Sequence, residues 1–137
     1  MEMHYKYVNE DTDRVNLYES TILSIEKDDN KHEIKFIVDW TEGDPYVIVK
    51  CEKCSNLIIN LSHNNRYEKK WIGTLEITGF SYIKKKDVYI VQFDFEHILS
   101  GYIRLECHNF IFLTPSKPIN IGGNDNLIEE YGTISIE

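Results

Sequence analysis

The stretch YIVQFDF at residues 89–95 places the apolar side chains of Tyr89, Val91, Phe93 and Phe95 at every second position. The same alternation runs through residues 34–40 and 47–51. A repeat of two residues is that of a β-strand, because successive side chains of a strand point to opposite faces. Almost no stretch longer than a turn repeats at helical spacing, so the sequence predicts an all-β fold with little or no helix.

The alternation predicts strands at residues 15–26, 32–41, 46–52, 56–62, 71–82, 87–96 and 101–114. Turn formers and solvated charges separate these runs, as in Asp28-Asp29-Asn30 and in the segment 42–45. Consecutive strands are therefore expected to pair antiparallel. About seven or eight short strands are typical of an antiparallel β-sandwich, with a flattened barrel as the alternative.

Length and composition predict one domain over residues 1–137, because 42% hydrophobic and 12% aromatic residues can supply a core. Residues 1–13 are predicted as an arm or an edge strand, and residues 115–137 as a looser C-terminal segment. Within that segment, Tyr131–Ile136 are expected to return as a final edge strand. A single helical turn at residues 127–131 is an alternative there.

The alternation changes phase once, late in the chain. Leu105 and Cys107 share one face of the last long run, whereas Phe110 and Phe112 fall on the other positions. A β-bulge at residues 108–109 would return the apolar side to the core. The alternative is a middle strand of a sandwich with both faces buried.

The net charge of −8 is unevenly distributed. Residues 1–45 hold 12 acidic and 5 basic side chains, residues 46–86 hold 3 and 8, and residues 87–137 hold 8 and 2. An acidic protein repels nucleic-acid phosphates, so we expect no DNA or RNA partner, whereas long-range attraction would draw in a cationic protein. Solubility is the alternative reason for the charge.

The acidic stretch DWTEGDP at residues 39–45 is the predicted partner-binding site. Asp39, Trp40, Glu42 and Asp44 combine three carboxylates with an indole at a strand end, and this composition suits an arginine-rich protein surface. An ordinary acidic turn is the alternative. Calcium is not expected, because a calcium loop needs about six oxygen ligands in a set pattern.

Cys51 and Cys54 have the C-x-x-C spacing of zinc and redox sites, but the sequence predicts core packing for them. Cys51 continues the apolar row that includes Val47, and the sequence contains no second C-x-x-C. Cys107 and His108 are adjacent on a strand and should point to opposite faces. We therefore expect neither a metal site nor redox catalysis.

The sequence contains no recognisable nucleophile and base pair. In the one acid–imidazole cluster, Asp94, Glu96 and His97, alternation places both carboxylates on the solvent side. The glycines of residues 122–125 precede Asn and Asp rather than the lysine and hydroxyl residue of a phosphate loop. We expect no enzyme activity and no cofactor.

Three cysteines, an odd number, fit a reducing compartment better than a disulfide framework. The N-terminus lacks the basic start and apolar run of a signal peptide, and no window approaches the ~20 apolar residues that cross a bilayer. These features predict a cytoplasmic protein without a membrane partner.

Three segments carry a resemblance to a group of small bacterial domains. Residues 16–25 resemble their opening strand, which commonly reads Leu-His-Asp-Ser/Ala-x-Ile-x-x-Ile, and Tyr18-Glu19 stands here in place of the usual His-Asp. Residues 46–57 are similar to their strand, short turn and strand, and residues 100–107 resemble their closing strand.

This group includes the immunity protein 50 family of bacterial polymorphic toxin systems, and uncharacterised relatives in Firmicutes. The resemblance spans residues 15–114. It implies an all-β fold and, for some members, inhibition of a partner toxin. It implies no catalytic residues.

Together these features predict a non-enzymatic protein-binding domain that neutralises a cationic bacterial toxin. One alternative is a small-molecule or carbohydrate-binding module that holds its ligand against Trp40, Tyr46, Trp71 or Tyr82. Another is a structural domain that forms a homo-oligomer through an exposed edge strand.

Overall fold

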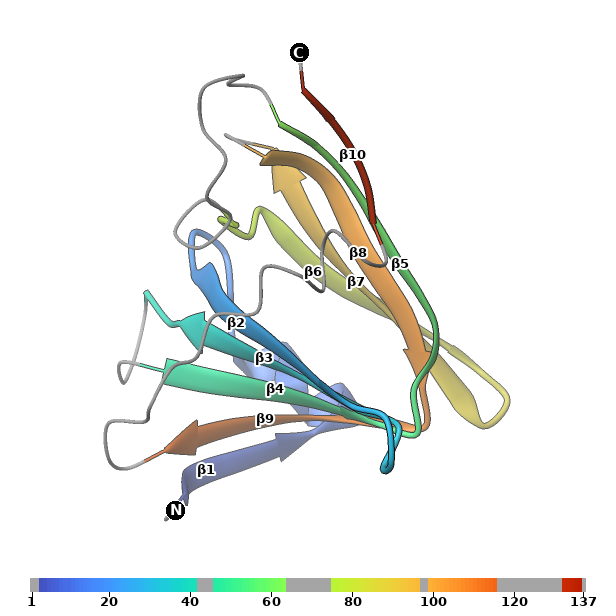
Figure 1. The fold of residues 1–137 in the computed structure, drawn as a ribbon. Helices are drawn as coiled ribbons and strands as arrows, with labels where there is room; N and C mark the ends of the chain where they lie inside the picture. The colour runs from blue at the N-terminus through green and yellow to red at the C-terminus, as the bar shows by residue number, and fades with distance from the viewer. Residues whose placement is uncertain (1–2, 42–45, 64–74, 97–98, 116–131, 137) are drawn as a thin grey trace.

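The computed structural model describes residues 3–41, 46–63, 75–96, 99–115 and 132–136. These residues form two sheets of five strands each, so the predicted all-β sandwich is confirmed (Figure 1). The first sheet has the order β1-β9-β4-β3-β2, and the second has the order β10-β5-β8-β7-β6.

The strands of the first sheet are β1 (Met3–Val8), β2 (Thr21–Asp28), β3 (Glu33–Asp39), β4 (Tyr46–Glu52) and β9 (Asn109–Pro115). Those of the second sheet are β5 (Ser55–His63), β6 (Gly79–Lys85), β7 (Val88–Glu96), β8 (Leu99–Cys107) and β10 (Gly132–Ile136). One 3-10 helix, η1 (Asn9–Arg14), follows β1.

The chain crosses from one sheet to the other between β4 and β5 and again between β8 and β9, and the sheets diverge from these crossings (Figure 1). The predicted single strand at residues 101–114 with a bulge is therefore wrong. Cys107 ends β8 in one sheet and Phe110 lies on β9 in the other, yet both are fully buried. The chain changes sheet at His108. The odd-numbered positions up to Cys107 face the core before this change, and the even-numbered positions from Phe110 face it afterwards, which accounts for the shift in the apolar pattern.

Both faces of β9 are buried, which agrees with the alternative prediction of a strand with two buried faces. Phe110 and Phe112 point into the core, and Ile111 on the opposite face is only 8% exposed. Ile48, on the neighbouring strand β4, is likewise buried on that face. The outer face of the first sheet therefore has a buried apolar centre.

Two predicted strands begin later than expected. The run predicted from residue 15 becomes strand only at Thr21, because residues 15–20 follow a bent path that still buries Val15 and Leu17. The run predicted at 71–82 becomes β6 only at Gly79. Buried apolar residues at alternate positions can thus line a core without belonging to a long strand.

The ends of the described chain lie at sheet edges. Met3–Val8 form an edge strand that pairs with β9, which confirms the edge-strand prediction for this part of residues 1–13. β10 is the expected final edge strand, but it pairs with β5 in parallel rather than antiparallel. A long intervening segment permits parallel pairing. The alternative helical turn at 127–131 lies outside the described residues.

Phenylalanine rings fill the space between the sheets. Phe93 of the second sheet lies 4.7 Å from Phe36 of the first, measured between ring centroids. Phe80 of β6 packs edge-on at 5.0 Å from Phe93 and at 5.3 Å from Phe112. Burial of such side chains is the main stabilising term of the fold, at about 25 cal/mol for each Å² removed from water.

Gly101 allows β5 and β8 to pair closely. Its φ is +130°, and a Cβ at this position would lie 2.0 Å from the backbone oxygen of Asn60 on β5. No side chain fits at that distance, so glycine is required here.

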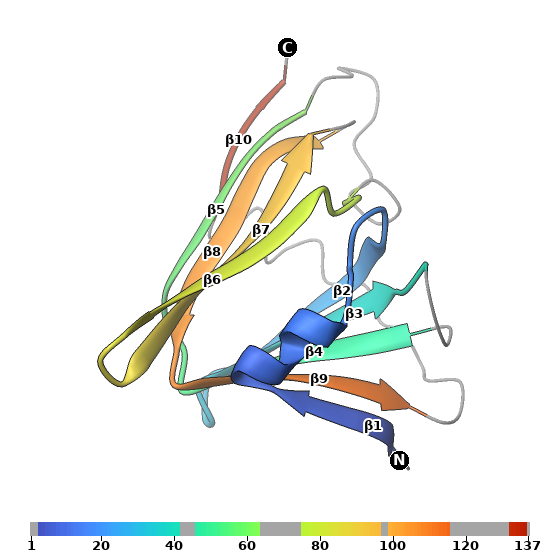
Figure 2. The same cartoon turned by 180° about the vertical axis from the view of Figure 1, so that it is seen from behind.

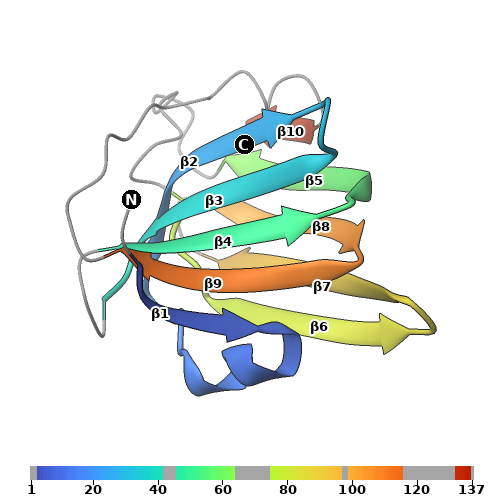
Figure 3. The same cartoon turned by 90° about the horizontal axis from the view of Figure 1, so that it is seen from below.

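The segment from Asn9 to Ser20 closes one flank of the sandwich, where η1 lies beside the edge strands β1 and β6 (Figures 2 and 3). The Asn9 side-chain oxygen accepts the backbone N–H of Phe110, at 2.9 Å. The hydroxyl of Tyr89 donates to Glu10 at 2.6 Å, and that of Tyr82 donates to Asp13 at 3.0 Å. These bonds hold η1 against both sheets.

Candidate functional site

The structure places half of the predicted partner-binding site. Asp39 is exposed at the last position of β3, and Trp40 follows it directly. Glu42 and Asp44 lie outside the described residues. The described part of this surface consists of Asp39, Trp40 and the residues that other segments bring beside them.

A row of outward-facing side chains continues from Asp39 across the sheet. Thr21 of β2 lies opposite Asp39, and Glu76 forms an isolated antiparallel bridge with Thr21. On the other side, Tyr46 of β4 lies opposite Asp39. Residues next to this row, such as Val38, are buried, so the row itself faces away from the core.

Trp40 is a fixed part of the fold rather than a free aromatic anchor. Its ring is partly buried and packs against the core, and its indole N–H donates to the carbonyl oxygen of Asn16 at 3.0 Å. The exposed aromatic side chain at this place is Tyr18, which is 49% exposed. The backbone N–H of Tyr18 donates to the side-chain oxygen of Asn16 at 2.9 Å, so Asn16 positions both aromatic residues.

Glu19 is held in place by hydrogen bonds to two distant segments. Its backbone N–H donates to the oxygen of Ile77 at 2.9 Å, and its carbonyl oxygen accepts the hydroxyl of Thr41 at 3.0 Å. The backbone N–H of Thr41 also donates to the hydroxyl of buried Ser20, at 3.1 Å. Glu19 has a φ of 67°, a left-handed conformation that non-glycine residues rarely adopt.

We call this surface the acidic end and define it as Tyr18, Glu19, Asp39, Trp40, Tyr46 and Glu76. Its three carboxylates come from three separate segments, and Tyr18 and Glu19 are both exposed. The hydrogen bonds between the segments fix its shape in the folded chain. Sequence reasoning missed Tyr18, Glu19 and Glu76, because only the tertiary pairing brings them to Asp39.

A groove of about 700 Å³, which we call the flank groove, runs beside the acidic end between β6 and the segment before β2. Tyr18 lines it from one side, and Phe80 and Tyr82 line it from β6. Asp13 and Thr78 add polar atoms, and the buried hydroxyl of Thr78 has no hydrogen-bond partner among the described residues.

The aromatic residues predicted to hold a small molecule do not form one cleft. Tyr82 lines the flank groove, whereas Trp40 and Tyr46 lie in the acidic end. Trp71 lies outside the described residues. The groove instead gains its aromatic lining from Tyr18 and Phe80.

The prediction of core packing is confirmed for Cys51, which is fully buried. Cys54 is only partly buried and packs against the core. Cys107 is buried and His108 is exposed, so the two point to opposite faces as predicted. In the described part of the chain, no three His, Cys, Asp or Glu side chains are grouped so that they could hold a metal ion.

The acid–imidazole cluster is described only in part. Asp94 accepts a hydrogen bond from the side-chain amide of Gln92 at 2.7 Å, and Glu96 is exposed at the end of β7. Both lie on the outer face of the second sheet, as predicted. His97 lies outside the described residues.

Among the described residues, no helix is long and apolar enough to span a membrane.

The fold is similar to that of an uncharacterized protein from Neisseria gonorrhoeae, known from a crystal structure. The TM-score is 0.52 and the sequence identity is 19%, over 85% of this chain and 100% of that chain. At this identity the similarity shows the fold alone. No protein-family model matches the sequence, and no curated protein matches it.

Proposed function

We propose that the protein is a non-enzymatic binding domain that recognises a basic surface of a partner protein through the acidic end. The observation that supports this best is that the pairing of distant segments brings Glu19, Asp39 and Glu76 to one end of the first sheet, where Tyr18 is exposed. Carboxylates and an exposed tyrosine at one surface suit an arginine-rich partner, because the carboxylates pair with guanidinium groups and the ring supplies a contact with few rotatable bonds.

The charge of the whole chain supports the same partner. A net charge of −8 attracts a cationic protein from a distance and raises the association rate. The fixed geometry of the acidic end reduces the ordering cost of binding, since Glu19 and Trp40 are already held by hydrogen bonds.

In its specific form, the proposal is that the protein neutralises a cationic bacterial toxin in the cytoplasm. The resemblance to the immunity protein 50 family supports this specific form, as does the acidic charge. The test is binding to the product of the neighbouring gene, followed by co-expression of the two proteins. Growth should be restored by the wild-type chain, and unchanged toxicity in its presence would count against neutralisation.

A matched pair of variants separates a specific site from general charge attraction. Glu19→Gln with Asp39→Asn removes two carboxylates from the acidic end, and Glu26→Gln with Glu96→Gln removes two exposed carboxylates elsewhere. We expect the first pair to weaken binding by about tenfold or more, which is about 1.4 kcal/mol. The second pair should change it by less than about threefold. Equal losses in both pairs would show that only the net charge matters.

A second candidate function is the binding of a sugar or another small molecule, and the flank groove favours it. Tyr18, Phe80 and Tyr82 line this groove with aromatic rings, and Asp13 and Asn16 add polar groups, as in many small-molecule sites. Thermal unfolding in the presence of a panel of sugars would test it. A rise in the unfolding temperature that is lost in Tyr82→Ala but kept in Ile83→Ala would support this function over the first.

A further inference from the structure

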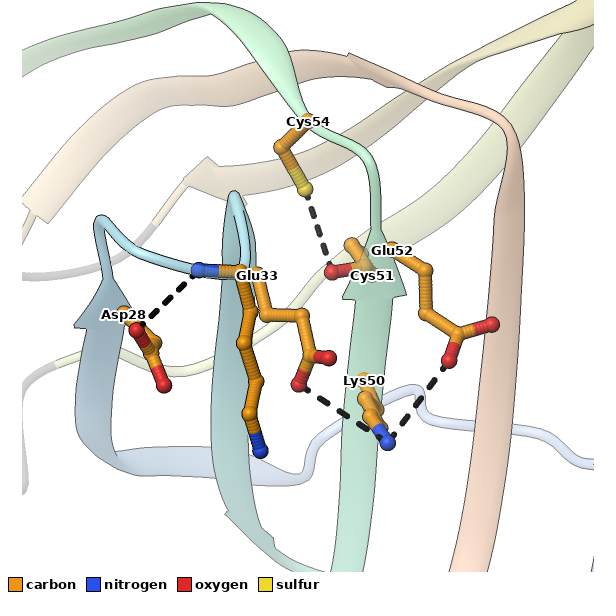
Figure 4. A network of polar contacts seen from close by, with 7 residues as sticks. Asp28, Glu33, Lys50, Cys51, Glu52 and Cys54 are labelled. Carbon is orange, nitrogen blue, oxygen red and sulfur yellow. Dashed lines mark hydrogen bonds and ion pairs between the residues drawn. The ribbon is translucent and has the colours of Figure 1, made fainter.

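The three cysteines of the chain meet at the crossing between the two sheets. Cys51 ends the inward-facing row of β4, Cys54 directly precedes β5, and Cys107 ends β8. The side chains of Cys54 and Cys107 lie close enough to Cys51 to influence its pKa. Figure 4 shows the Cys54 sulfur directed at Cys51, 3.1 Å from its carbonyl oxygen.

Only Cys54 can meet a reagent from solution. Cys51 and Cys107 are 0% exposed, whereas Cys54 is partly exposed and lines a pocket of about 400 Å³. Ile34 and Leu57 also line this pocket, which can admit a small thiol compound. This position at the entrance separates Cys54 from an ordinary buried cysteine, which is inert.

The pKa of Cys54 is lowered from its ordinary value. The neighbouring Cys51 side chain is the largest cause and the Ile34 backbone adds to it, against the opposing effects of burial and of the Glu33 and Glu52 charges. Lys50 lies 3.7 Å from Glu33 and 3.6 Å from Glu52, so it offsets part of that opposition (Figure 4).

Cys51 has the opposite tendency. Its contacts with Cys107 and with Cys54, together with complete burial, raise the pKa of Cys51 well above its usual range. Of the two thiols, Cys54 is therefore the one that ionises more readily. This is the division of roles between an attacking thiolate and a second thiol that reacts afterwards.

We propose that Cys54 is a nucleophilic thiol that reacts with low-molecular-weight disulfides entering this pocket, and that Cys51 then resolves the product into a Cys51–Cys54 disulfide. The two residues are three apart in sequence, and the sulfur of Cys54 lies 3.1 Å from the backbone oxygen of Cys51. Lys53 between them has a φ of 54°, so the chain turns sharply between the two cysteines.

The chemistry is two successive thiol–disulfide exchanges. In the first, the Cys54 thiolate attacks one sulfur of the small disulfide RSSR, the S–S bond breaks, and one RS⁻ leaves. In the second, Cys51 loses its proton to that leaving thiolate and attacks the Cys54 sulfur, which releases the second RS⁻. The protein loses two electrons and two protons in total, and the small disulfide becomes two thiols.

This site is separate from the acidic end, which lies at the opposite ends of β3 and β4. Its test therefore does not depend on the proposed function. A partner-binding failure would leave the thiol chemistry unaffected, and a failure of the thiol chemistry would leave partner binding unaffected.

The probe is the aromatic disulfide dithionitrobenzoate, added to the folded full-length chain. We expect the wild type to release about two equivalents of thionitrobenzoate, because the second exchange follows the first. Trypsin cleaves after Lys53, so the Cys51–Cys54 disulfide would appear in the mass spectrum as two linked peptides.

Cys54→Ala should slow the release of thionitrobenzoate more than tenfold. Cys51→Ala should release one equivalent and keep the probe on Cys54, and the matched control Cys107→Ala should still release about two.

A second measurement covers the case in which a cysteine variant does not fold. Alkylation of the wild-type chain by iodoacetamide should modify Cys54 first, with a pH midpoint below that of the same cysteine in the unfolded chain. The proposal would be overturned by release only after unfolding, by a linked pair that contains Cys107 instead of Cys54, or by a Cys54 midpoint above that of the same cysteine in the unfolded chain.

Discussion

The crossing between the sheets and the acidic end lie at opposite ends of β3 and β4, and the chain is fixed differently in each. At the crossing, Cys51 and Phe110 are fully buried, and the backbone N–H of His108 donates to Glu52 at 2.9 Å. At the acidic end, Tyr18 and Asp39 are exposed, and individual hydrogen bonds of Glu19, Trp40 and Thr41 hold the segments together. The same alternating pattern therefore supplies packing at one end and a surface for recognition at the other.

The difference shows where stability and binding can be changed independently. Side chains at the crossing are surrounded by the core, so their removal leaves a cavity. Side chains at the acidic end can be replaced by others that water solvates, so their removal should affect a partner more than the fold. The expected effects on stability decrease from the buried ring of Phe110 to the exposed ring of Tyr18.

Phe110→Ala should give the largest loss of stability. The Phe110 ring is fully buried and lies 5.1 Å from the ring of Tyr82 and 5.2 Å from that of Tyr89. Truncating such a ring typically lowers the free energy of unfolding by about 3–5 kcal/mol. Urea unfolding followed by fluorescence measures this loss, and a value below about 1 kcal/mol would contradict the assignment of the crossing as the packed end.

Trp40→Phe should give a smaller loss. Phenylalanine keeps most of the packing but cannot donate the indole hydrogen bond to Asn16. The expected decrease in the free energy of unfolding is about 1 kcal/mol, the usual net value of one hydrogen bond. A loss as large as that of Phe110→Ala would show that the acidic end depends on packing as strongly as the crossing does.

Tyr89→Phe should change how stability depends on pH. The hydrogen bond to Glu10 is the largest cause that raises the pKa of Tyr89 from its ordinary value of 10.0 to about 12, followed by burial. A raised pKa stabilises the fold fully below pH 10, and this stabilisation is lost as the pH rises from about 10 to about 12.

The measurement is urea unfolding of the wild type and of Tyr89→Phe between pH 8 and 12. The advantage of the wild type should shrink across the upper half of this range, because the phenylalanine variant has no hydroxyl to ionise. An advantage that stays constant up to pH 12 would show that the Tyr89 hydroxyl does not respond to Glu10.

Tyr18→Ala should have the smallest effect on stability. The side chain is 49% exposed, so the free energy of unfolding should change by about 0.5 kcal/mol or less. The same variant should weaken binding to a basic partner by about tenfold or more if Tyr18 is the anchor of the acidic end. Full affinity in Tyr18→Ala would remove this residue from the site, whereas a large loss of stability would place it in the core.

Alternation predicted which side chains face the core, but not which strands are neighbours. Phe36, Val49 and Phe93 are all buried, as their spacing indicates. The change of sheet at His108 could not be predicted in this way, because a bulge, a middle strand buried on both faces and a crossing are all compatible with the same apolar pattern.

The candidate site was predictable only where its residues are close in sequence. Asp39 and Trp40 stand out by composition, and a strand end was the correct place for them. Glu76 reaches the same surface through its bridge to Thr21, and no local pattern encodes that register. Contacts between segments far apart in the sequence depend on the whole packed fold, so the site became complete only in the structure.

The strand order also decides when the protein can fold during its synthesis. β9 lies between β1 and β4, and β8 lies between β5 and β7, so neither sheet is continuous until residues 99–115 have been made. β1 is synthesised first but cannot pair until β9 has been made, and β5 likewise cannot pair with β8 until β8 has been made. Such distant pairings slow folding and leave strand edges exposed on the nascent chain, where a chaperone would be most useful.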